Sequence, residues 1–351
     1  MEIQEQEIKQ EIAPETSEPA PIKKRERIWE IDFFRGVCVL LMILDHFAML
    51  VGTFFAPQWY GNSFVMRGVG DSFSTFCYNW VIGSASHVRD IIHPIVLFVF
   101  FSISGISCTL SHNNLKRGFQ LLIVAIIYSI GSYIAQEFMG INGVFVSFGV
   151  LDFLAVSMLL YAFVAFVCRN NRWAICGVSV ALIVTTLCLY FLYTAPASTP
   201  KIFCFIFPQR DFWGNPSLFY RQYEVSPGDM FPMIPWTAFY FAGALLGQLF
   251  YVKKQSLLKK FPLEIAGEKI CASIDEKMQQ GNQKALKNGL PVLVAISHVK
   301  RARQAFRCIV LRPVCFVGKH ALIIYVVHVV ALAAILSLIT GLFITPGNFG
   351  F

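Results

Sequence analysis

Hydrophobic residues along this chain occur in long, nearly uninterrupted runs separated by polar stretches. A helix of about 20 apolar residues crosses a hydrocarbon core of ~30 Å, and seven runs approach or exceed that length. They cover residues 33–55, 92–110, 119–138, 148–168, 173–194, 232–252 and 319–343. The pattern predicts an all-α, polytopic transmembrane helix bundle of about seven spans.

The polar stretches divide the chain into four predicted parts. Residues 1–26 are rich in Glu and Pro, which predicts a disordered cytoplasmic tail. Residues 27–252 hold the first six spans and form the predicted transmembrane core. A basic cytoplasmic insert covers 253–318, and the last span with a short outer tail covers 319–351.

Charge indicates how the bundle is oriented. Only 14% of the residues are charged, against about 25% in soluble domains, and the net charge is +8. With the amino-terminus inside, most Lys and Arg residues fall on the inner side, as the positive-inside rule requires. The positive charge is therefore explained by membrane topology, so the lipid bilayer is an expected partner and nucleic acid is not.

The basic insert is the least expected part of the sequence. Between residues 290 and 312, five basic residues and no acidic one alternate with apolar positions at near-helical spacing. This pattern predicts an amphipathic helix on the anionic inner leaflet, where it could also attract the phosphates of a ligand. A solvated linker is an equally good interpretation of residues 264–289.

Familiar catalytic and metal-binding motifs are absent from the sequence. The ten cysteines are scattered without zinc spacing, so no metal site is expected. Cys77 and Cys204, both in predicted outer connections, could form a disulfide, although free thiols are the default expectation. No P-loop, GxSxG, HExxH or GxGxxG sequence is present.

The first apolar run carries ionisable residues at membrane depth. Asp32, Arg35 and His46 share one helix face, since steps of three and eleven residues return to nearly the same direction at ~100° per residue. His46 would lie ~16 Å from Arg35 along the axis, near the middle of the bilayer. Such groups usually mark a functional path, although an interfacial ion pair and an interhelical hydrogen bond would also explain them.

Further polar residues occur in or beside the other spans. His93-Pro94 is predicted to open the second span, with Pro at the first helical position. Ser102–Ser107 forms a small, polar face. The remaining candidates are Arg117, Asp152, Asp229, Trp236, Tyr325 and His328. Each alone could be a satisfied interhelical hydrogen bond, but His46, Asp152 and His328 on three helices together favour acid–base chemistry.

Taken in order, these segments resemble a known family. The pattern R-x4-D-x2-RG-x9-H from Arg27 to His46 is similar to the opening of the heparan-alpha-glucosaminide N-acetyltransferase catalytic family and its bacterial relatives. The segments that follow this opening also match in order. They are Pro94–Ser107, Leu115–Gly118, Phe148–Leu151, Asp229–Gly247 and Gly318–His328.

The resemblance implies an enzyme that moves an acyl group from cytosolic acyl-CoA to a sugar or glycan at the outer face, with no metal. His46 stands where bacterial relatives often carry His, whereas the animal enzymes use a histidine of the first outer connection. In this chain that connection offers His87 and His93, so which histidine is catalytic stays open. Asp152 stands where family members more often have His or Gln.

Roles for the candidate residues follow from this hypothesis. Asp32 would hold Arg35, and His328 and Tyr325 would orient the acceptor or polarise the thioester carbonyl. Asp229 would bind acceptor hydroxyls together with Trp236, or Asp229 would instead stabilise a helix N-terminus. Phosphates of acyl-CoA would be met by Arg27, Arg35, Lys116 and Arg117.

Two other functions stay open. The same histidines could serve a proton-coupled transporter or exporter of a glycan or small molecule, and a non-catalytic scaffold is a third hypothesis. The sequence has no N-x-S/T sequon and no large domain before the first span, which favours a bacterial plasma membrane over a lysosomal one. Whether the protein is a homo-oligomer is left open.

Overall fold

A computed structural model describes residues 28–60, 72–139, 143–192, 200–207, 225–257 and 311–343, with scattered positions between 269 and 288. In these parts of the chain the regular structure is helical, apart from one isolated bridge between Phe148 and Met230. Seven helical segments are long and apolar enough to cross a membrane. The predicted all-α bundle with seven spans is confirmed.

The seven spans follow one another in chain order. The first consists of α2 (Trp29–Met49), the π-helical η1 (Leu50–Phe55) and α3 (Ala56–Tyr60), which run on as one segment. The others are α6 (Ser86–Leu110), α7 (Asn114–Met139), α8 (Val150–Val167), α9 (Arg172–Leu192), α11 (Met233–Phe250) and α15 (Ala321–Phe343). Shorter helices are α5 (Ser72–Val81), η2 (Lys201–Phe205) and α14 (Arg312–Lys319).

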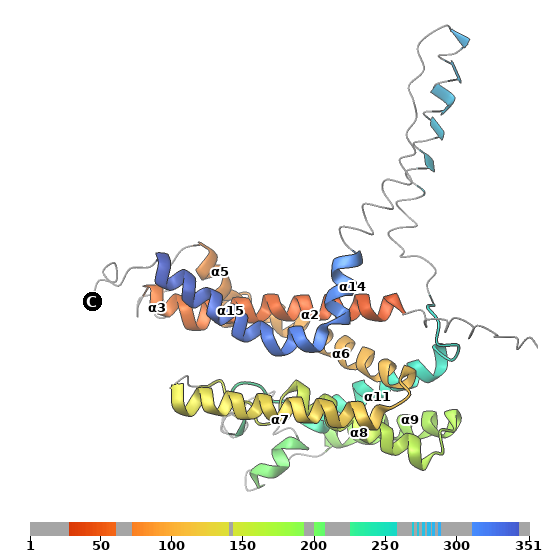
Figure 1. Ribbon diagram of the computed structural model, residues 1–351, viewed down its shortest axis with the longest axis horizontal. Helices are drawn as coiled ribbons and strands as arrows, with labels where there is room; N and C mark the ends of the chain where they lie inside the picture. Colours follow the sequence, from red (N-terminus) through yellow and green to blue (C-terminus); the bar gives the residue numbers. More distant parts are fainter. Residues whose placement is uncertain are drawn as a thin grey trace, which may run out of the picture.

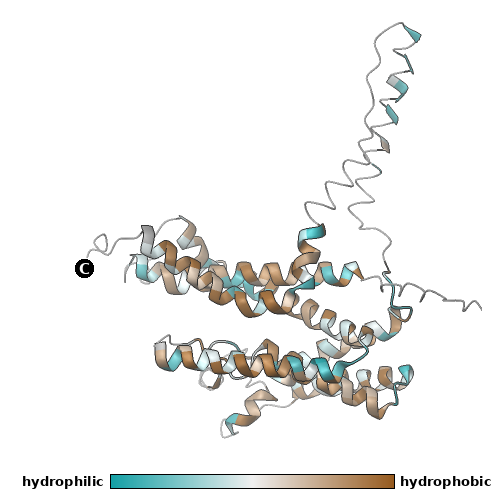
Figure 2. Cartoon of the chain, in the orientation of Figure 1, coloured by the Kyte–Doolittle hydropathy of each residue, from teal (hydrophilic) through white to brown (hydrophobic). Residues whose placement is uncertain are grey.

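The helices form two layers (Figure 1). One contains α2, α3, α5, α14 and α15, and the other contains α7, α8, α9 and α11. Helix α6 connects the layers, because it packs extensively against α11 and also against α2. Apolar side chains cover much of both layers, as lipid-facing helices require (Figure 2).

Glycines allow the closest helix crossings. A Cβ atom on Gly105 of α6 would collide with the backbone of Tyr240 in α11, and one on Gly243 would collide with the backbone of Ser102. In the same way, a Cβ on Gly318 of α14 would collide with the backbone of Asp32 in α2. Small residues permit this approach, and close backbone packing stabilises helix pairs in lipid.

The second span begins earlier than predicted. Helix α6 starts at Ser86, so Pro94 lies inside the helix and the expectation that it occupies the first helical position is wrong. The predicted start of this span, residue 92, is too late because the charge of Arg89 lowers the local hydropathy. In the folded chain Arg89 is paired with Asp45 of α2. In the connection between the first span and α6, the described residues include helix α5.

Further predictions concern a disulfide, the amino-terminal tail and the basic insert. Cys77 and Cys204 are both buried, and no disulfide joins them. The tail at 1–26, Arg27 and residues 290–310 of the predicted amphipathic helix lie outside the described residues. Arg312, the last basic residue of that predicted helix, begins α14.

Candidate functional site

Two histidines from different spans meet inside the bundle. Nε2 of His328 on α15 lies 2.9 Å from Nδ1 of His46 on α2. The ring centroids are 5.0 Å apart, and His328 is buried. The structure thus brings together two of the three titratable residues that the sequence singled out on separate helices.

Hydrogen bonding assigns the tautomers of this pair. Nδ1 of His328 lies 2.6 Å from the carbonyl oxygen of Tyr325, which can only accept, so this nitrogen carries the proton. In a neutral ring, Nε2 of His328 is then an acceptor, and Nδ1–H of His46 donates to it. Nε2 of His46 keeps its lone pair, which is the arrangement of an oriented base.

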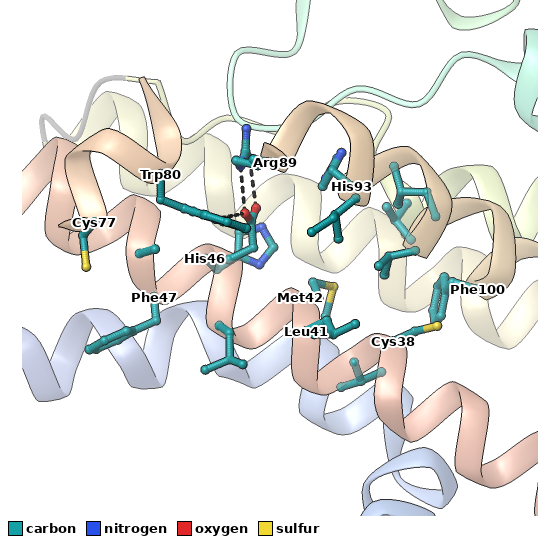
Figure 3. Close-up of a pocket in the computed structure, with 18 of the residues that line it drawn as sticks. Cys38, Leu41, Met42, His46, Phe47, Cys77, Trp80, Arg89, His93 and Phe100 are labelled. Carbon is teal, nitrogen blue, oxygen red and sulfur yellow. Dashed lines mark hydrogen bonds and ion pairs between the residues drawn. The ribbon is translucent and has the colours of Figure 1, made fainter. Parts of the chain in front are cut away.

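An ion pair lies beside His46 on the same turn of α2. Asp45 accepts hydrogen bonds from Nε and Nη2 of Arg89 on α6, at 2.7 and 2.8 Å, and from Nε1 of Trp80 on α5 at 3.1 Å. Figure 3 shows Trp80 and Arg89 close to His46, with their contacts to this carboxylate as dashed lines. The two hydrogen bonds from Arg89 offset the energetic cost of a carboxylate within a membrane span.

A cavity of about 430 Å³ lies next to these residues, which is within the range of small-molecule sites. It is bounded by α2, α5 and the first half of α6, with Val150 at the start of α8. All but four of its lining residues are apolar, aromatic or cysteine. The four are Asp45, His46, Arg89 and His93. His46 faces this cavity, whereas His328 is not among the lining residues and stands behind it.

A second polar cluster surrounds the start of α8. Asp152 accepts from the backbone N–H of Gly149 at 3.0 Å, so it caps its own helix. Asp229 accepts from the backbone N–H of Val150 at 3.5 Å and lies near the side chain of Tyr325. Asp229 therefore stabilises a helix N-terminus, but that of α8, and not of α11 as its sequence position suggested.

The electrostatic environment of Asp229 is unusual for a carboxyl group. Burial raises its pKa to about 7, and the nearby Asp152 acts in the same direction. Tyr325 connects this cluster to the histidine pair, since its carbonyl oxygen accepts from His328. Asp229 thus lies beside α15 at Tyr325, and neither Asp152 nor Asp229 lines the cavity.

Of the predicted donor-binding residues, those that the structure describes lie at the other end of the spans. Arg35 contacts Asp32 at 3.5 Å and donates to Oγ of Ser107 on α6. Arg35 and Arg117 both act electrostatically on the thiol of Cys108 at the end of α6, which brings these two cations to one region. Lys116, beside Arg117, is exposed.

Trp236, which the sequence predicts as a substrate contact, lies among other aromatic side chains. Its ring packs against Phe101, Phe231 and Phe239, with centroids 5.4–5.6 Å apart, and does not line the cavity. His93 lines the cavity on the exposed side of α6, whereas His87 does not line it.

Sequence reasoning missed the partners of Asp45. A carboxylate within a span needs a cation, and Arg89 lies three residues before the second predicted span, which starts at residue 92. This requirement could have identified Arg89 from the sequence, but no sequence feature pointed to Trp80 as a partner of Asp45. Within the described parts of the chain, no group of three or more His, Cys, Asp or Glu residues is placed to hold a metal ion.

Comparison with known proteins gives one match. The model of the family described as heparan-alpha-glucosaminide N-acetyltransferase, catalytic, matches residues 73–272. This range contains His93, Arg117 and Asp152, whereas His46 and His328 lie on either side of it. Neither the curated proteins nor the solved structures contain a match.

Proposed function

Because the chain belongs to the heparan-alpha-glucosaminide N-acetyltransferase catalytic family and is a membrane acyltransferase, we propose that its donor is cytosolic acyl-CoA and its acceptor a sugar or glycan at the outer face. An acetyl group is the acyl group that the family name indicates. The observation that supports a site at mid-membrane is the 2.9 Å contact between His46 and His328 beside a cavity.

His46 is the proposed general base. Its Nε2 would remove the proton from an acceptor hydroxyl or amine while the acceptor oxygen or nitrogen attacks the thioester carbonyl carbon. The positive charge formed on the His46 ring would be stabilised by the hydrogen bond from Nδ1–H to His328. The C–S bond then breaks, and the proton passes to the departing CoA thiolate.

His328 is a positioning residue in this scheme. Both of its ring nitrogens are engaged, one by the Tyr325 carbonyl and one by His46, so it has no lone pair for the substrate. The Tyr325 side chain lies near the carboxyl group of Asp229. This favours orientation of His46 over the alternative that these residues polarise the thioester.

The donor phosphates would be bound by Arg35, Lys116 and Arg117 at the predicted inner end. Support comes from the common placement of Arg35 and Arg117 near Cys108 and from the exposure of Lys116. Charge-assisted hydrogen bonds to phosphate are among the strongest that a protein makes. His46 lies eleven residues beyond Arg35 on α2, or ~16 Å along the axis.

Acyl transfer from labelled acetyl-CoA in proteoliposomes tests the assignment. His46→Ala should lower kcat by about 10²–10⁴-fold. His87→Ala is the matched control, since His87 is exposed on α6 and does not line the cavity. Unchanged turnover in both His46→Ala and His93→Ala would sink the assignment of the base.

A proton-coupled transporter is the alternative that the paired imidazoles also favour, because a chain of hydrogen-bonded histidines can carry protons. It needs no acyl-CoA. Thermal stabilisation by CoA supports the enzyme, whereas flux that follows a pH gradient, without any stabilisation at millimolar CoA, supports the transporter.

A further inference from the structure

The cavity beside His46 has few polar groups to offer a ligand. Both oxygens of Asp45 are occupied by Arg89 and Trp80, and Nδ1 of His46 is occupied by His328. What remains on its wall is Nε2 of His46, the His93 ring and the unused N–H groups of Arg89. A sugar ring has several hydroxyl groups, and a buried hydroxyl without a partner is unfavourable.

Part of the wall of this cavity is formed by exposed apolar side chains. Leu44 is 63% exposed, Phe76 58% and Phe73 54%, and in a membrane protein exposed apolar surface of this kind suits contact with lipid. Figure 3 shows Leu41, Met42 and Phe100 on one side of Arg89 and Phe47 on the other. A hydrocarbon chain in the membrane could therefore enter sideways without crossing water.

The donor is expected at the opposite end of the spans. Arg35 and Arg117 lie near Cys108, the last buried residue of α6, whereas the cavity is lined by the first half of that helix. An occupant that reaches His46 from the cavity therefore comes from the side of the acceptor.

We propose that the acceptor is a membrane-dissolved lipid with a hydroxyl- or amine-bearing head group, such as a glycolipid, whose chain occupies this cavity. Its polar head lies at the Asp45–Arg89 end and presents one nucleophilic group to Nε2 of His46. Acyl transfer to this lipid rests on the proposed acyltransferase activity. Binding of the lipid's hydrocarbon chain in the cavity does not rest on it.

Photo-crosslinking in nanodiscs tests the binding alone. The probe is an alkyl glucoside that carries a diazirine and an alkyne in its chain, and adducts are located by peptide mass spectrometry. Adducts should concentrate on lining residues such as Met42 and Phe76. Val96→Trp fills the cavity and should lower these adducts about tenfold or more, because several methylene groups lose their site.

The matched control is Val180→Trp. Val180 lies on α9, faces outward with 46% exposure and does not line the cavity, so this variant should label like the parent. Adducts spread evenly over the lipid-facing helices, and equal in both variants, overturn the proposal. Competition by palmitoyl-CoA and not by unlabelled alkyl glucoside also overturns it, since the cavity would then hold the donor's chain.

The chemical step is followed separately with labelled acetyl-CoA and a glycolipid extract. Label in the chloroform phase that depends on His46 and is lost in Val96→Trp supports the proposal. Label only on water-soluble sugars, with no cavity adducts, refutes the lipid acceptor and leaves the proposed function intact. Cavity adducts without any acyl transfer support lipid binding and refute the proposed function.

Discussion

Nε2 of His328 lies 2.9 Å from Nδ1 of His46, although 282 residues separate the two histidines in the sequence. The contact fixes which nitrogen of His46 is available, because Nδ1 of His328 is anchored by the carbonyl oxygen of Tyr325. The reactive direction of one imidazole on α2 is therefore set by the backbone of α15.

His328→Phe should lower kcat about 10–100-fold with little change in either KM, since groups that orient a reactive side chain have effects of this size. The phenyl ring cannot accept from Nδ1–H of His46, so the base loses its orientation. His328→Gln should restore much of the activity, because its side-chain carbonyl can accept that hydrogen bond. Equal loss in both variants would contradict the positioning role.

The Asp45–Arg89 pair should stabilise the fold only as a pair. Arg89→Leu leaves a carboxylate within a span, and Asp45→Leu leaves a guanidinium, so each should cost about 3–5 kcal/mol. The lower end of this range applies, since the side chains of Arg89 and Asp45 are still 22% and 15% exposed. Thermal unfolding in detergent should show the double variant losing less than the sum of the single ones.

Asp90→Leu is the control for this cycle. Asp90 is exposed beside Arg89 and should change stability by no more than about 0.5 kcal/mol. Strictly additive losses in the double variant would show that the two side chains act independently.

Asp229 should make stability depend on pH. Its pKa in the folded protein is raised to about 7 from the ordinary value of 3.8, so between these values the folded chain holds a proton that the unfolded chain has released. Stability should therefore fall as pH rises from about 4 to about 7 and then level off.

Asp229→Asn removes the titration and keeps an amide oxygen that can accept from Val150 N–H. The melting temperature of this variant, measured across the same pH range, should lack the decline that the parent shows. A parent and variant with parallel pH profiles would exclude Asp229 as its origin.

Glycine substitutions should separate the helix crossings from the lipid-facing surface. Gly105→Ala places a methyl group against the backbone of Tyr240 and should cost about 1–3 kcal/mol through overpacking. Gly131→Ala on α7 meets nothing within 4 Å and should be neutral or stabilising, by up to about 1 kcal/mol from helix propensity. Detergent melting temperatures of the two variants measure this contrast.

The candidate site was only partly predictable. The sequence singled out His46 and His328, because an imidazole within an apolar run is visible from composition alone, and the folded chain brings the two rings together. It grouped Asp152 with them, whereas the folded chain uses Asp152 as a cap for α8. It predicted that Trp236 contacts the substrate, and in the folded chain that ring packs among Phe101, Phe231 and Phe239.

The sequence by itself determined the seven spans and the common face of Arg35 and His46, because hydropathy and helical spacing are local properties of about 20 residues. Only the tertiary structure decided that His46 meets His328 and that Asp45 meets Arg89. Helices in lipid gain no hydrophobic energy from a particular neighbour, so partner choice depends on close packing and hydrogen bonds between residues far apart in the chain. The glycine crossings of α6 with α11 and of α2 with α14 are contacts of this kind.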